Sequence, residues 1–333
     1  MLYRELGRSG VRVSALVMGC WALADTATWG PQSEADSIAT VHAALDLGID
    51  TFDTAEGYGG GESEVVLGRA LRGRREQVVI ATKVSRSNLS AESVRQACED
   101  SLARLGTDYI DLYQVHWPSR SVLLEETLGA LEDLQDEGKV RAVGVCNFGV
   151  GDLSELAATA GAQRPVVSNQ LPYSLLWRAV EYEIRPACVD AGLGILCYSP
   201  LSQGLLTGKY RSPGDVPEGR ARTRLFSSRR PQARHGEPGA EEEVFRALVE
   251  IEGICDEGGW PMASVALAWL LQQPGVTSVI AGARTPDQIR QTAQAADLNL
   301  APETVARLSA ATDEVKHLIG PNADMWQSES RFR

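Results

Sequence analysis

Four side chains that can transfer or stabilise a proton stand at the ends of three successive predicted strands in the first third of the chain. Asp53 and Tyr58 share a glycine-rich loop, Lys83 ends the next strand, and His116 ends the one after it. A lone phenol, with a pKa of ~10, is a poor acid–base group at neutral pH. A neighbouring ammonium group lowers that pKa, a carboxylate holds the ammonium group in place, and a histidine can polarise a carbonyl oxygen. The set predicts a relay that gives a proton to an oxygen while a hydride reaches carbon.

Each of these side chains also has an ordinary structural interpretation. Taken alone, Tyr58 is more typical of a packing or capping residue, and Lys83 of a solvated lysine. Asp53 suits a helix N-cap, and His116 suits a core histidine. We expect the set to be functional because parallel α/β proteins gather substrate-facing groups at the carboxyl ends of their strands.

Alternating strands and helices must bring these residues to one rim. A β-hairpin is expected from residues 2–6 and 11–14, and eight short apolar strands follow it. This order predicts a (β/α)8 TIM barrel that forms one domain over residues 1–333. A doubly wound open sheet is the alternative, but no strand is followed by a Gly-x-Gly-x-x-Gly turn. The strands are expected at 15–18, 49–52, 78–82, 109–115, 140–145, 166–168, 194–197 and 276–280, and helices at 33–47, 65–71, 90–105, 124–137, 153–160, 181–191, 241–255, 262–273 and 286–295.

One loop is too long for a simple connection. Residues 208–239, after the seventh strand, are rich in Arg, Pro, Gly and Ser. Loops of this length are uncommon and serve as lids or are disordered. Two interpretations therefore stay open, a cover over the cofactor or substrate and a floppy insertion.

The composition excludes several classes of function. The 333 residues are 44% apolar and 23% charged, as in ordinary globular enzymes. A net charge of −12 argues against a nucleic-acid partner or an anionic membrane surface. Residues 1–14 lack a signal-peptide core, and the longest apolar run, 265–271, is too short to span a bilayer. We therefore expect a cytoplasmic protein.

Cysteines and histidines give no metal-binding pattern. The six cysteines contain no Cys-x-x-Cys spacing, so reduced and mostly buried thiols are expected. The histidines form no ligand pair at helical spacing, and no metal is predicted. They are His42, His116, His235 and His317.

Several longer motifs resemble those of the aldo-keto reductases, and they cover nearly the whole chain. The segments 114–118 and 319–325 are most similar to the bacterial branch that includes inositol-catabolism-type reductases, and the potassium-channel β-subunits are more distant relatives. The matching motifs lie at residues 52–59, 81–83, 143–148, 204–209, 282–288 and 109–118.

The resemblance implies a hydride-transfer enzyme that interconverts an aldehyde, ketone or sugar-like carbonyl with an alcohol. It makes Tyr58 the general acid–base group, has Lys83 and Asp53 tune it, and has His116 orient the carbonyl. It also implies a nicotinamide cofactor bound without a Rossmann domain. NADPH is the expected form, and NADH is the less favoured alternative.

The same resemblance assigns residues to the cofactor. Ser168, Asn169 and Gln170 would face the carboxamide of the nicotinamide, and Tyr198 would stack on its ring, as an aromatic face suits a planar ring. The segment 199–203 would meet the pyrophosphate, and the loop from Gly282 would line the adenosine end. The full predicted set is Cys20, Trp21, Asp53, Ser168, Asn169, Gln170, Tyr198, Ser199, Pro200, Leu201, Ser202, Gln203, Lys209, Arg222, Gly282, Arg284 and Gln288.

The adenosine end departs from the family pattern. A Glu-Asn pair near the adenine is Gln291-Thr292 in this chain, which removes a carboxylate and an amide. The density of basic residues nearby favours NADP over NAD. The candidates for a 2′-phosphate ligand are Lys209, Arg220, Arg222, Arg224 and Arg284.

Substrate contacts are expected from Trp21, Tyr58, His116 and Trp117. Further aromatic candidates for the pocket rim suit a sugar-like or secondary-metabolite carbonyl, although single aromatic residues are more often core. They are Trp29, Phe148, Tyr173, Trp177 and Trp326.

Two other functions are less favoured by the sequence. A reductase fold can serve as a redox-sensing, cofactor-binding regulatory subunit with little turnover, but the intact relay speaks against it. A glycosidase on the same barrel needs two facing carboxylates. Only Asp53 and Glu56 stand near the predicted site, and both lie on one loop. The sequence predicts no oligomeric state.

Overall fold

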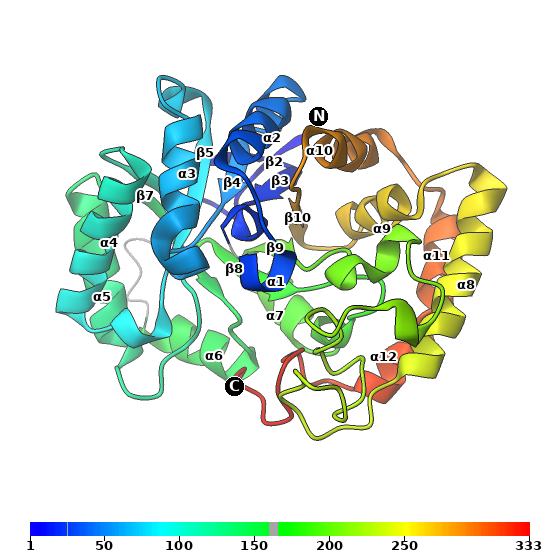
Figure 1. Cartoon of the computed structure of the whole chain (residues 1–333). Coiled ribbons are helices and arrows are strands. Elements are labelled where there is room, and N and C mark those ends of the chain that lie inside the picture. The colour runs from blue at the N-terminus through cyan, green and yellow to red at the C-terminus, as the bar shows by residue number, and fades with distance from the viewer. Residues whose placement is uncertain (25, 160–165) are drawn as a thin grey trace.

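Eight parallel strands close into a barrel in the order β10-β3-β4-β5-β6-β7-β8-β9, which confirms the predicted fold (Figure 1). The computed structural model describes residues 1–24, 26–159 and 166–333. An antiparallel hairpin, β1 (Tyr3–Glu5) and β2 (Arg12–Ser14), precedes the barrel. The barrel strands are β3 (Leu16–Gly19), β4 (Thr51–Asp53), β5 (Val79–Val84), β6 (Ile110–Val115), β7 (Val140–Cys146), β8 (Ser168–Pro172), β9 (Gly194–Tyr198) and β10 (Val276–Gly282).

The strand register aligns the ends that carry the predicted chemistry. Asp53 in β4 pairs with Gly19 in β3 and with Ala81 in β5. Lys83 in β5 pairs with Gln114 in β6. The strands are buried on both faces, as the continuous apolar runs predicted. Residues that are distant in sequence therefore meet at one rim.

Helices surround the barrel, and α2 (Glu34–Asp46) and α4 (Ala91–Leu105) begin at the serines that open their predicted ranges. The Ser33 side chain accepts from Asp36 N, and the Ser90 side chain from Ser93 N. The helix predicted at 153–160 starts three residues earlier, and its predicted end, Ala160, lies outside the described residues. The helices are α1 (Thr26–Trp29), α2 (Glu34–Asp46), α3 (Glu62–Ala70), α4 (Ala91–Leu105), α5 (Leu124–Asp136), α6 (Val150–Thr159), α7 (Ile184–Asp190), α8 (Glu241–Gly258), α9 (Met262–Leu271), α10 (Pro286–Ala293), α11 (Pro302–Ala310) and α12 (Asp313–Ile319). Of these, α1, α11 and α12 were not predicted.

Strand β8 is shifted toward the carboxyl terminus relative to the prediction of 166–168. It runs from Ser168 to Pro172, so the polar run at its start lies inside the barrel wall. Asn169 remains buried there because its amide bonds to the backbone N–H and carbonyl of Phe148. A polar run with such partners can continue a strand.

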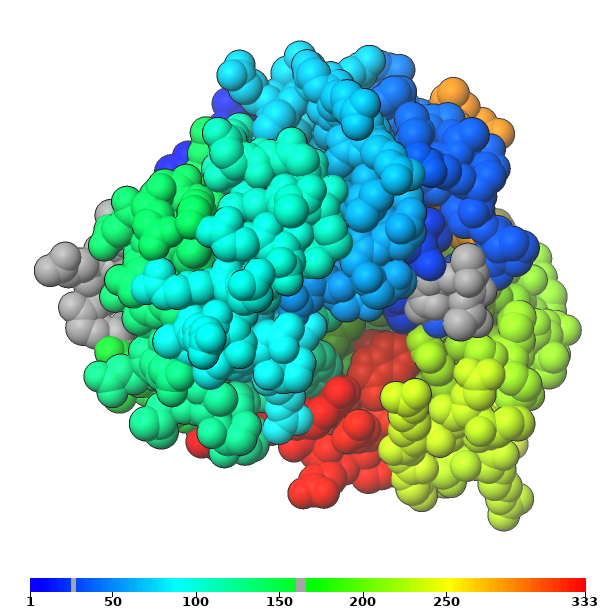
Figure 2. Space-filling view, turned by 60° about the vertical axis from the view of Figure 1, so that its left-hand side comes forward, coloured from blue at the N-terminus to red at the C-terminus, as the bar shows by residue number. Residues whose placement is uncertain are grey.

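The long loop, residues 208–239, is held against residues 320–333, which we call the C-terminal tail. Arg224 donates to the carbonyl oxygens of Asn322 and Asp324 at 2.9 and 3.2 Å. Gly236 N donates to Ser328 Oγ at 2.7 Å. Figure 2 shows the tail in red beside the yellow-green loop. These bonds favour an ordered cover over a floppy insertion.

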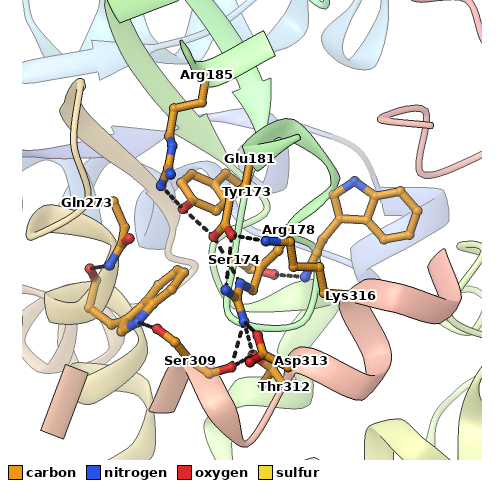
Figure 3. Close-up of polar contacts among 12 residues, drawn as sticks. Tyr173, Ser174, Arg178, Glu181, Arg185, Gln273, Ser309, Thr312, Asp313 and Lys316 are labelled. Atoms are coloured by element: carbon orange, nitrogen blue, oxygen red, sulfur yellow. Dashed lines mark hydrogen bonds and ion pairs between the residues drawn. The ribbon is translucent and has the colours of Figure 1, made fainter. Parts of the chain in front are cut away.

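A buried ion network fastens the end of β8 to α11 and α12 (Figure 3). Arg178 donates to both carboxylate oxygens of Glu181, at 2.9 and 3.0 Å, and to Asp313 at 2.8 Å. Lys316 and Tyr173 also donate to Glu181. Burial alone would raise the pKa of Glu181, but these donors lower it to about 2.

Among the described residues, no helix combines the length and apolarity needed to span a bilayer.

We predict that Arg178→Met lowers the free energy of unfolding by about 3 kcal/mol, because it leaves Glu181 with fewer donors in a buried site. Urea unfolding followed by tryptophan fluorescence measures the change. Arg307→Met, which removes the exposed pair with Glu257, is the matched control and should change stability by less than about 0.5 kcal/mol. Equal small effects for both variants would contradict this role of the network.

Candidate active site

The carboxyl ends of the strands open into a cavity of about 1040 Å³, which is lined by predicted catalytic residues and by most of the predicted cofactor residues. Three of the four catalytic candidates line it directly, and Lys83 lies just beneath, fully buried. The lining includes Cys20, Trp21, Trp29, Asp53, Tyr58, His116, Trp117, Asn147, Gln170, Tyr198, Ser199, Pro200, Leu201, Gln203, Lys209, Arg220, Arg222, Arg234, Gly282, Arg284, Gln288, Gln291, Thr292, Trp326, Gln327 and Arg331.

Lys83 lies between the carboxylate and the phenol, as the strand ends predicted. Its Nζ is 2.6 Å from Asp53 Oδ1 and 3.4 Å from Tyr58 Oη. The carbonyl oxygen of Thr54 accepts a third bond at 2.7 Å. The other oxygen of Asp53 accepts from Gln170 Nε2 at 2.8 Å. The Lys83 ammonium group therefore directs N–H donors at both the Asp53 carboxylate and the Tyr58 oxygen.

The glycine-rich loop gives Tyr58 its direction. Gly59, Gly60 and Gly61 all have positive φ, between 59° and 98°, a region that other residues rarely adopt. A Cβ on Gly59 would lie 2.7 Å from the side chain of Ala24. The backbone can therefore turn tightly after Tyr58 and start α3, while the phenol faces Lys83.

His116 lies edge-on to the phenol, with ring centroids 5.9 Å apart. Its backbone is fixed by a bond from its N–H to Val84 O and by a bond from Asn147 Nδ2 to its carbonyl, both at 3.0 Å. Burial, with the charges of Lys83 and Arg331, lowers the pKa of His116 to about 3. The imidazole is therefore neutral at pH 7 and can donate one hydrogen bond.

The phenol of Tyr58 keeps its proton, which differs from the expected lowering of its pKa. Burial raises the pKa of Tyr58 to about 12, and it outweighs the opposite effect of the Lys83 charge. The Asp53 carboxylate adds to the rise because it offsets the charge of Lys83. Burial disfavours a charged lysine, but Asp53 and Tyr58 outweigh it and hold the pKa of Lys83 above its usual value. The pair is thus a phenol beside an ammonium ion.

The turn after β9 has an unusual backbone. Ser199, Ser202 and Gln203 have φ values of 51°, 46° and 58°, and Gly204 follows at 96°. Non-glycine residues in such conformations cluster at ligand sites. The Gln203 side chain lines the cavity, and its Oε1 has no hydrogen-bond partner among the described residues.

Three predicted cofactor residues do not line the cavity. Ser168 and Asn169 lie in the barrel wall because β8 extends past them, and Ser202 bonds to Ser174 within the protein. Asn147, which the prediction omitted, lines the cavity beside Gln170. Its Oδ1 accepts from Tyr198 Oη at 2.9 Å. Its place directly after β7 is the signal that could have identified it.

Two of the five candidate 2′-phosphate ligands are engaged elsewhere. Arg224 is 6% exposed, points into the tail and does not line the cavity. Arg284 lines the cavity, but its guanidinium donates to Gln32 Oε1 and to the carbonyl oxygens of Trp29, Gly30 and Pro31. It therefore ties residues 29–32 to the loop after β10. Lys209, Arg220 and Arg222 also line the cavity, and Arg220 donates to Tyr210 Oη at 3.0 Å.

The aromatic candidates divide between the cavity and the core. Trp21, Trp29, Trp117 and Trp326 line the cavity, and the rings of Trp21 and Trp29 meet edge to face at 5.4 Å. The other three are at most 1% exposed and pack in the core, so they do not form the rim. They are Phe148, Tyr173 and Trp177.

Comparison with known proteins agrees with this geometry. Residues 15–313 match the Aldo/keto reductase family. The chain is 35% identical to the Aldo-keto reductase YhdN of Bacillus subtilis over 87% of each protein. It is 34% identical to the NADH-specific methylglyoxal reductase of Escherichia coli, covering 89% of this chain and 93% of that protein.

A solved structure gives the same result. An aldo/keto reductase from Klebsiella pneumoniae, in complex with NADP and acetate, matches 92% of this chain and 94% of its own with 31% identity and a TM-score of 0.73. The chain belongs to the aldo/keto reductase family. It is an oxidoreductase of the class that interconverts small carbonyl compounds and alcohols.

We predict that His116 contributes to acid destabilisation. The unfolded chain binds a proton here below pH ~6.5, whereas the folded chain binds it only near pH 3, so stability falls as the pH drops through that window. Between pH 7 and pH 5 the loss from this group is about 2 kcal/mol. Urea unfolding at both pH values should show a smaller loss for His116→Asn than for the wild type. An equal loss in both proteins would contradict the buried neutral state of His116.

Proposed function

We propose that the protein reduces an aldehyde or ketone to an alcohol with NADPH, with Tyr58 as the proton donor. The observation that carries this proposal is Lys83 Nζ, which lies 2.6 Å from Asp53 and 3.4 Å from the Tyr58 oxygen at the base of the cavity. His116, whose ring lies beside the phenol, would supply a second hydrogen-bond donor to the carbonyl oxygen of the substrate.

The cavity residues suit a nicotinamide dinucleotide. Residues of the left-handed turn at 199–204 line the cavity where a pyrophosphate would lie. The amide oxygen of Gln203, which has no hydrogen-bond partner among the described residues, suits a donor of the bound ligand. Asn147 and Gln170 offer side-chain amides beside Tyr198, where the nicotinamide would lie. When bound, the reduced nicotinamide supplies the hydride that the carbonyl carbon accepts.

The relay residues supply the rest of the chemistry. Tyr58 and neutral His116 would both donate hydrogen bonds to the carbonyl oxygen, which polarises the carbonyl and makes its carbon more electrophilic. Trp21 and Trp117 flank this position and reduce access of water. As hydride arrives, negative charge develops on the oxygen, where both donors are already directed.

The proton then moves from Tyr58 to that oxygen. An alkoxide is about as basic as hydroxide, whose conjugate acid has a pKa of ~15.7, so a phenol with a pKa of about 12 can still protonate it. The adjacent Lys83 ammonium group stabilises the phenolate that forms. Solvent returns a proton to Tyr58 after the alcohol leaves.

The choice of NADPH rests on the basic residues of the cavity. Lys209, Arg220 and Arg222 line it and offer cations for a 2′-phosphate. The Klebsiella structure holds NADP, whereas the Escherichia coli relative is NADH-specific. We favour NADPH because these three basic side chains all line the cavity.

Other inferences stay predictions. A single barrel domain over residues 1–333 is supported by the tail, which packs against the loop 208–239. The inositol-catabolism-type branch is not specified by the names of the relatives above. A sugar-like substrate and a cytoplasmic location also stay predictions.

We predict that Tyr58→Phe lowers kcat at least about 100-fold, because the variant lacks the proton donor but keeps the ring. Steady-state assays with an aldehyde panel measure this loss, and tryptophan quenching measures cofactor binding, which should persist. Equal turnover by the variant would contradict the proposal. Cofactor binding without turnover by the wild type would instead favour the redox-sensing regulatory subunit.

We predict that NADPH raises Tm more than NADH at equal concentration, because only NADPH can pair its 2′-phosphate with the basic lining. Thermal shift with each cofactor measures the difference. Arg284→Met is the control. The Arg284 guanidinium bonds to residues 29–32, so its removal should lower the Tm increase from NADPH and the Tm increase from NADH to the same extent. Equal or greater stabilisation by NADH would contradict the preference.

A further inference from the structure

Arg331 lies at the substrate end of the cavity, beside the proposed hydrogen-bond donor. Its guanidinium carbon is 3.7 Å from the centre of the Trp117 ring, and Trp117 directly follows His116 in the chain. All three residues line the cavity. A planar guanidinium stacks well on an indole face, so Arg331 has a defined position next to the reacting groups.

Asp324 fixes the orientation of this guanidinium. Its carboxylate is fully buried and accepts from Arg331 Nε at 2.6 Å and from Nη2 at 2.8 Å. The same carboxylate accepts from the backbone N–H of Trp326 and of Arg331. A bidentate pair of this kind holds the guanidinium plane in one direction.

The end of the tail, next to Arg331 in the chain, is itself docked on the barrel. The Phe332 ring meets Trp117 edge to face, with centroids 5.6 Å apart. The backbone oxygen of Arg333 accepts from Gly151 N at the start of α6. A Cβ on Gly149 would lie 2.3 Å from that oxygen, so a glycine is needed for the tail to dock. Arg331 is therefore preorganised by the protein.

The remaining nitrogen of Arg331 is available to a ligand. Nε and Nη2 bond to Asp324, and no acceptor in the described part of the chain lies within hydrogen-bond distance of Nη1. The side chain is 26% exposed and lines the cavity. Two N–H bonds on a fixed cation are suited to a carboxylate oxygen.

The charge of the cavity also favours an anion. The chain carries −12, yet the described lining has six basic side chains and one carboxylate, Asp53, which is paired with Lys83. Of the six, Arg331 is itself paired with Asp324, which lies behind the lining. A cleft of one sign concentrates ligands of the opposite sign. Cofactor phosphates would use part of this charge, but Arg331 lies beside His116. The basic residues are Lys209, Arg220, Arg222, Arg234, Arg284 and Arg331.

We propose that the carbonyl substrate carries a carboxylate, which Arg331 binds through Nη1 while the carbonyl oxygen lies at Tyr58 and His116. This inference rests on the proposed function and names the substrate class of the same site. Arg331 is the specificity-determining residue, and Asp324 positions it. Trp117 and Trp326 line this part of the cavity, so an apolar aliphatic or aromatic segment would join the two groups of the substrate.

Matched substrate pairs test the inference. They are 4-carboxybenzaldehyde with methyl 4-formylbenzoate, and succinic semialdehyde with butanal, assayed with NADPH. The wild type should favour the carboxylated member of at least one pair by 10-fold or more in kcat/KM. Arg331→Met should lower that preference roughly 10- to 100-fold, mainly through KM, as expected for one charged hydrogen bond. Arg331→Lys should give an intermediate preference because it keeps the charge without the fixed fork.

Controls separate recognition from a structural role of Arg331. Arg307→Met, on the exposed face of α11, should leave the preference unchanged. Asp324→Asn should lower the preference although Arg331 is still present. No preference in the wild type, or an equal loss for both members of a pair in Arg331→Met, would overturn the inference and leave the proposed function intact. No turnover of any of the four substrates would overturn both.

Discussion

The buried pair between Lys83 and Asp53 is the interaction on which the site depends. Burying two charges costs several kcal/mol per ion unless close contact and further hydrogen bonds compensate. Here Thr54 and Gln170 supply those bonds, so strands β4, β5 and β8 all contribute to one pair. Burial, with a smaller contribution from the Asp53 carboxylate, keeps the nearby phenol protonated, so the site is arranged to donate a proton rather than to hold an anion.

Much of the fold and the core of the site could be predicted from local patterns. Apolar runs of five or six residues with glycine or serine at their ends mark strands and caps, and Val79–Val84 and Ser90 are clear cases. Parallel strands bring their carboxyl ends to one rim, so Asp53, Lys83 and His116 could be grouped without coordinates. Tyr58 could be grouped with them because it lies on the glycine-rich loop that follows Asp53.

The rest depended on contacts between distant residues. Asn169 is inside β8 because Phe148 satisfies its amide, and Arg284 is tied to residues 29–32, which lie 252 or more positions earlier. The protonated state of Tyr58 follows from burial, which strand patterns do not report. Arg331 lies in a tail without periodicity, and its place at the cavity is given by Asp324 and Trp117.

Proton transfer and substrate recognition would depend on different parts of the chain, because the tail that docks on α6 is separate from the strands of the relay. The groups that would move the proton come from residues 53–116 and are built into barrel strands and their adjoining loops, whereas Asp324, Trp326 and Arg331 come from a segment that rests on the barrel from outside. Substitutions in that segment can alter which molecules are accepted without disturbing the buried ion pair beneath. Selectivity in this protein can therefore diverge by exchange of a short appendage while the reaction itself is inherited unchanged.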